Sequence, residues 1–172
     1  MTQPDEFQQP IRKKSHLAPV DSYLTGSWDA LGNGAPVLVA LAQIASQAMI
    51  HGPAVEPDRL SPEAKAILFM AQKRGIIEIK AVNTAFDAAL RILAVYVEQE
   101  DDHQVAFRDP YQPEVTISFL HGFQELCEQG LVMHQLHRDF SLTKSGFALA
   151  KTILKKDVQA WLAKATDIGL HD

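Results

Sequence analysis

The chain has 172 residues, of which 47% are hydrophobic and 22% are charged, and these fractions are close to those of an average globular protein. Such a composition excludes a wholly disordered, fibrous or membrane-embedded chain. The formal net charge is −5, so the molecule as a whole has no positive field that attracts nucleic acid or anionic lipid.

Cysteine content and hydropathy indicate the compartment. Cys127 is the only cysteine, which excludes an intramolecular disulfide and favours a reducing compartment. Residues 1–30 contain no apolar run typical of a signal peptide. The most apolar stretch, residues 35–50, is interrupted by Gln43 and Gln47 and is shorter than the roughly 20 residues of a membrane span. We therefore expect a cytoplasmic protein that makes no contact with a membrane.

The chain divides into three segments. Residues 1–34 mix Gln, Pro, Ser and Gly without sustained periodicity, which predicts a polar arm whose first fifteen or so residues are mobile. Residues 35–102 are predicted to form a supporting set of helices, and residues 103–172 a mixed segment of strands and helices.

Two helices are predicted early in the supporting segment. The first follows Pro36, which suits the first turn of a helix, and has apolar residues at helical spacing. The second has Ser61 as its N-cap, Pro62 at its first position and Gly75 beyond its end, all typical helix boundaries.

The remainder of this segment predicts one strand and one helix. The β-branched run at residues 76–79 indicates a strand. Because this strand is short, we expect it to make only a minor contribution to a sheet. Thr84 and Asp87 are spaced like a helix start. Phe86, Leu90, Leu93 and Val97 follow at helical spacing, which predicts a central helix.

The last segment changes pattern. Val105 and Phe107 are two residues apart, between the polar residues Gln104 and Arg108, and indicate a strand. A helix is then expected from about Glu114 to Gln129, with Gly130 as its stop. Residues 131–136 and 139–142 are expected to pair as a hairpin that turns around His137 and Arg138, before Thr143 caps another helix.

The run GLVMHQLHRDFSLTKSGFALA, residues 130–150, resembles the end of winged-helix domains of bacterial regulators, including the multiple-antibiotic-resistance type. There, "GL", a two-stranded wing and "LTxxG" recur in this order. Here they are Gly130-Leu131, the hairpin, and the run from Leu142 to Gly146. The resemblance covers about Val105 to Lys156. The sequence thus predicts a mainly α fold with a small β-hairpin (α+β), in which a helical bundle is fused to a winged-helix-like module.

Some winged helices of this type bind DNA. The resemblance to them implies that the 114–129 helix enters the major groove and that the turn at His137 and Arg138 contacts the DNA backbone. The outward face of that helix carries no Lys or Arg, and residues 110–150 hold two basic against four acidic residues, a formal charge of −2. DNA binders need several basic contacts to phosphates. DNA binding is therefore the alternative function, in which Ser118, His121 and Gln124 read base edges and Lys144, Lys151 and Lys155 contact phosphates.

The favoured prediction is a non-enzymatic regulatory or adaptor protein that binds another protein, or itself, through the winged-helix-like segment. An exposed hairpin edge can extend a partner's sheet. The predicted interaction residues are Ser118, His121, Gln124, Glu125, His137 and Arg138. A stripe at helical spacing from Val158 to Ile168 is a further candidate surface, unless it closes the protein's own core.

No pattern of catalysis, metal binding or cofactor binding emerges. His121 and Cys127 are expected on opposite faces of one helix. If His134 and His137 occupy one strand, their odd spacing places them on opposite faces, so these four residues do not converge on a metal. The P-loop, zinc-protease and nucleophile-elbow signatures do not occur. We expect no cofactor, no metal and no catalytic residues.

Overall fold

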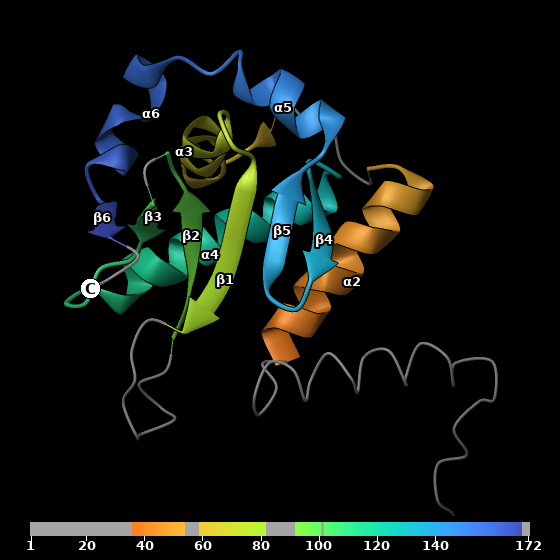
Figure 1. Cartoon of the computed structure of the whole chain (residues 1–172), viewed down its shortest axis with the longest axis horizontal. Coiled ribbons are helices and arrows are strands. Elements are labelled where there is room, and N and C mark those ends of the chain that lie inside the picture. Colours follow the sequence, from red (N-terminus) through yellow and green to blue (C-terminus); the bar gives the residue numbers. More distant parts are fainter. Residues whose placement is uncertain (1–35, 54–58, 82–91, 101, 170–172) are drawn as a thin grey trace, which may run out of the picture.

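The computed structural model describes residues 36–53, 59–81, 92–100 and 102–169 (Figure 1). The predicted polar arm, residues 1–34, and the predicted helix start at Thr84 lie outside these residues.

The two early helices form as predicted. Helix α2 spans Pro36–His51 and helix α3 spans Pro62–Ala71. The Ser61 hydroxyl accepts a hydrogen bond from the Ala64 amide at 3.2 Å, which satisfies a backbone donor that the helix itself leaves unpaired. Gly75 ends this region with a φ of 70°, a backbone conformation that costs glycine little.

A sheet of six strands organises the described residues, and the predicted mainly helical fold with a small hairpin is therefore wrong. All pairings are antiparallel, and the strand order is β4-β5-β1-β2-β3-β6. The strands are β1 Ile76–Ala81, β2 Leu93–Glu98, β3 His103–Phe107, β4 Val132–Leu136, β5 Asp139–Leu142 and β6 Thr166–Gly169. Instead of making a minor pairing, β1 is a central strand between β5 and β2.

Strand β2 replaces the end of the predicted central helix. Leu93 and Val97 are four residues apart, a spacing that also suits a helix, but residues 94–97 are all buried. Val95 and Val97 enter the main core, whereas Ala94 and Tyr96 pack with Ala106 of β3. Because both faces of the strand are covered, the alternation that marks a half-buried strand is missing.

The last segment contains the expected helix, hairpin and helix in that order. Helix α4 spans Pro113–Glu128, the β4–β5 hairpin turns at His137 and Arg138, and α5 spans Lys144–Ala150. Helix α6 spans Lys155–Leu162. The helical stripe predicted up to Ile168 is wrong at its end, because residues from Thr166 onward form β6 and pair with β3.

The helices lie in two groups around the sheet. Helix α4 crosses behind the strands, with α2 beside it, and α3, α5 and α6 gather at one end of the sheet (Figure 1). The sequence predicted separate segments at residues 35–102 and 103–172, but the two share this sheet, because β2 pairs with β3 and β1 pairs with β5. They also share one core, whose largest buried side chains include Ile67, Leu68, Ile77, Val95, Phe107, Phe119, Phe123 and Phe140.

Candidate functional site

Helix α4 is a core helix that exposes only a narrow strip. It packs against α2, α3 and β2, and at Gly122 an added Cβ would lie 2.8 Å from the Ala64 backbone nitrogen of α3. Phe119 and Phe123 are buried. The exposed residues of the helix are Pro113, Glu114, Ile117, Ser118 and His121. This strip brings Ser118 and His121 together with one acid and no basic residue.

The other two predicted α4 residues have partners within the protein. Gln124 donates a hydrogen bond from Nε2 to Glu128 at 2.9 Å. The Glu125 carboxylate accepts one from the backbone amide of Ser61 at 2.8 Å. Glu125 therefore connects α4 to the start of α3, and neither side chain is free to meet a partner without losing a bond.

The hairpin turn is also held from within. His137 has a φ of 52°, and its carbonyl oxygen lies 2.7 Å from Nε2 of His134. Nε of Arg138 lies 2.7 Å from a carboxylate oxygen of Glu78 on β1. The structure thus directs Arg138 toward the sheet, while His137 remains exposed.

Glu78 is the centre of a polar cluster that the sequence reasoning missed. It also contacts Lys80 at 3.3 Å and accepts a hydrogen bond from Gln104 at 3.1 Å. The Lys80 amine lies 4.3 Å from the centre of the Tyr96 ring. Burial raises the pKa of the Tyr96 phenol, because the charged form loses its hydration. In the sequence, this cluster could have been suspected from Glu78 and Lys80, two charged residues inside the otherwise apolar strand β1.

The predicted phosphate contacts lie on the two last helices. Residues 143–166 contain five lysines and one aspartate, a formal charge of +4, in a chain whose net charge is −5. All five lysines are exposed. Among the residues that the structure describes, no carboxylate forms an ion pair with any of them. We call Lys144, Lys151, Lys155, Lys156 and Lys164 the lysine surface.

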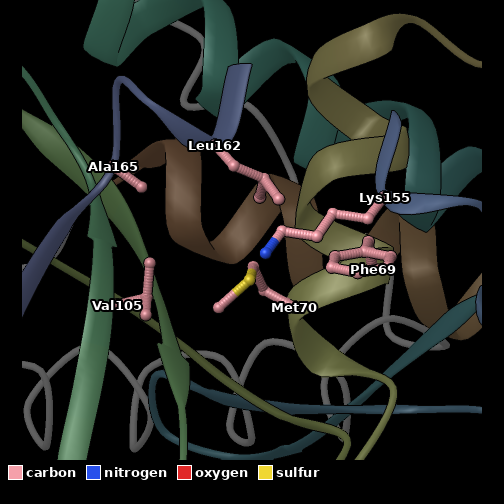
Figure 2. Close-up of a pocket in the computed structure, with 6 residues that line it drawn as sticks. All are labelled: Phe69, Met70, Val105, Lys155, Leu162 and Ala165. Carbon is pink, nitrogen blue, oxygen red and sulfur yellow. The ribbon is translucent and has the colours of Figure 1, made fainter. Parts of the chain in front are cut away.

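A pocket of about 350 Å³ lies beside this surface. Its lining comes from α3, β3 and α6, and from Ala165 in the link between α6 and β6 (Figure 2): Phe69, Met70, Val105, Lys155, Leu162 and Ala165. Five of these side chains are apolar, and Lys155 is the only charged one. Sequence periodicity gave no sign of this pocket, because its residues are up to 96 positions apart, from Phe69 to Ala165.

The described residues form neither a metal-ligand cluster nor a membrane-spanning helix. In that part of the chain, no three or more His, Cys, Asp and Glu side chains are arranged to hold a metal ion. Within the same ranges, none of the helices has the length and apolar character needed to cross a membrane.

Comparison of the chain with models of protein families, with curated proteins and with solved structures finds no match.

Proposed function

We propose that this chain is a non-enzymatic regulatory or adaptor protein of the cytoplasm whose winged-helix-like half binds an acidic segment of another protein. The observation that carries the proposal is the lysine surface: five exposed lysines accompanied by one acid on α5, α6 and their flanks. The cytoplasm is proposed because a single cysteine suits a reducing compartment.

The lysine surface suits an anionic partner for an electrostatic reason. Lys155 and Lys156 stand in the first turn of α6 beside Asp157, and two cations against one acid are disfavoured at this end of the helix dipole. The hydroxyl-bearing residues that usually cap a helix are also missing there, since the N-cap is Leu154. Cations placed against the local field, without carboxylate partners among the described residues, favour a role in binding over a role in folding.

A protein partner is preferred to DNA because of α4. The resemblance would place this helix in the major groove, but the described α4 is packed on several sides and exposes an acid without any Lys or Arg. Arg138 at the hairpin turn is paired with Glu78. An acidic peptide requires only the surface charges, whereas sequence-specific DNA binding also requires side chains that reach base edges.

DNA binding remains the second candidate, and the same lysines favour it. Five lysines can provide several of the phosphate contacts that hold a protein on a duplex. In this case the lysine surface on α5 and α6, and not α4, contacts the DNA phosphates, and binding does not depend on the base sequence of the DNA.

A peptide selection tests the proposal. Random peptides displayed on phage are selected on the wild-type protein and on a variant in which Lys144, Lys151, Lys156 and Lys164 are changed to Gln. A second variant with Lys65→Glu and Lys73→Glu, two exposed residues that belong to neither α5 nor α6, has the same change in net charge and serves as its control. We expect acidic peptides that bind the wild type and the control at least tenfold more tightly than the first variant.

The same proteins are then titrated with a fluorescent random-sequence duplex across a salt series. Weak or undetectable duplex binding is expected. Micromolar duplex binding that falls steeply with salt, together with a failure to select acidic peptides, would overturn the proposal in favour of DNA. Selection of peptides that bind all three proteins equally would overturn it in favour of another surface.

A further inference from the structure

The pocket beside α6 is lined by five apolar side chains and one positively charged side chain, that of Lys155. Phe69 and Met70 come from the end of α3, Val105 from β3, and Leu162 from the end of α6, with Ala165 just beyond. Val105 is 5% exposed and belongs to the main core, so this wall of the pocket is continuous with the core of the protein.

Lys155 supplies the charge. Figure 2 shows its side chain running beside Phe69, with the amine nitrogen directed toward the space between Met70 and Leu162. A lysine commonly lays its methylene stem along apolar surface while its amine stays accessible to solvent. The neighbouring Lys156 is exposed but does not line the pocket, which makes it a matched control.

The volume limits the size of a ligand. A cavity of roughly 150 Å³ lined by apolar side chains holds a benzene molecule, and this pocket of about 350 Å³ is a little more than twice as large. It also falls at the small end of the range of roughly 300 to 1,000 Å³ that is typical of small-molecule sites. By this scale it accommodates an aliphatic chain on the order of six to twelve carbons.

We propose that this pocket binds a free aliphatic carboxylate of medium chain length. The hydrocarbon chain lies among Met70, Val105 and Leu162, and the carboxylate accepts a charge-assisted hydrogen bond from the Lys155 amine. No covalent step is involved. This site shares Lys155 with the lysine surface, but its ligand is a small molecule and its binding needs no protein partner.

Isothermal titration calorimetry with octanoate tests the assignment. Wild type and Lys156→Gln are expected to bind octanoate saturably and within twofold of each other. Lys155→Gln should weaken binding at least tenfold, and Ala165→Leu, which fills part of the pocket, should abolish it. The neutral analogue 1-octanol should bind the wild type at least tenfold more weakly than octanoate. Thermal melts followed by circular dichroism check that each variant is folded.

Backbone amide resonances provide a second readout. Octanoate should shift the amide signals of Val105 and Leu162 in the wild type, and these shifts should be lost in Lys155→Gln at the same ligand concentration. Absence of saturable heat with millimolar octanoate would refute the assignment. Binding to Lys155→Gln as strong as to the wild type would refute it as well. Because Lys155 is exposed, its substitution leaves the fold intact and keeps the test decisive even if Ala165→Leu unfolds.

Discussion

The Glu125 carboxylate of α4 accepts a hydrogen bond of 2.8 Å from the backbone amide of Ser61, directly before α3. These two residues are 64 positions apart in the chain. The bond satisfies an amide at a helix start, where donors lack partners within the helix, and the negative charge lies at the positive end of the α3 dipole. One side chain of α4 thus takes part in the capping of α3.

Removing this carboxylate should weaken the fold. Glu125→Ala is expected to lower the free energy of unfolding by about 1 to 2 kcal/mol, and Glu125→Gln by less, because the amide oxygen still accepts a bond. His121→Ala, an exposed position one turn earlier on α4, should change it by less than about 0.5 kcal/mol. Urea unfolding followed by circular dichroism measures all three. Equal stability of Glu125→Ala and His121→Ala would contradict this role.

Gly75 should tolerate no side chain. Its φ is 70°, and an added Cβ would collide with the Phe147 ring of α5. Gly75→Ala is therefore expected to cost about 2 to 4 kcal/mol, the sum of backbone strain and overpacking. Gly52 has a φ of 84° but open space around its Cβ position, so Gly52→Ala should cost only about 1 kcal/mol. Comparable losses in the two variants would show that the Phe147 contact contributes nothing.

Glu78 should contribute more to stability than an exposed acid. Its side chain is 15% exposed and contacts Arg138, Lys80 and Gln104, whereas Glu100 is 64% exposed and lies 3.8 Å from Lys73. Glu78→Gln is expected to cost about 1 to 2 kcal/mol, since two cations lose their shared partner. Glu100→Gln should cost less than about 0.5 kcal/mol. Thermal unfolding at matched pH and ionic strength compares them, and the reverse order would exclude the cluster as a stabilising element.

Cys127 should be chemically inert in the folded protein. The thiol is buried, and burial raises its pKa, so the reactive thiolate is scarce near neutral pH. Reaction with a thiol-specific disulfide reagent is expected to begin only at urea concentrations that unfold the chain. Rapid stoichiometric reaction in native buffer would show that the thiol is accessible.

The raised pKa also predicts a pH dependence of stability. A cysteine in the unfolded chain ionises above a pH of about 8.5, while the folded thiol stays protonated, so the unfolded state then binds fewer protons. Stability is therefore fully present below that pH and falls as pH rises, by up to about 1.4 kcal/mol per unit. In Cys127→Ala this contribution to the slope between pH 8.5 and 9.5 should disappear. An unchanged slope in that variant would contradict the assignment.

Neighbouring residues along the chain determined much of the local structure. Ser61 and Thr143 were predicted as N-caps, and each hydroxyl accepts a bond from the amide three residues later. Gly130, predicted as the end of α4, has a φ of 65°. The hairpin turn at His137 was also predicted. Caps, stops and tight turns act over a few residues, so sequence patterns report them directly.

Only the tertiary structure decided the sheet and the candidate sites. The spacing of Leu93 and Val97 suits a helix, but pairing with β1 and β3 makes this segment a strand buried on both faces. Partners far away in the chain also direct Arg138 to Glu78 and place Lys155 beside Phe69 and Met70. Strand pairing, ion pairing and pocket formation derive their free energy from residues that are distant in sequence, and the periodicity of one segment contains no information about them. The cap at Ser61 was therefore predictable, and its bond to Glu125 was not.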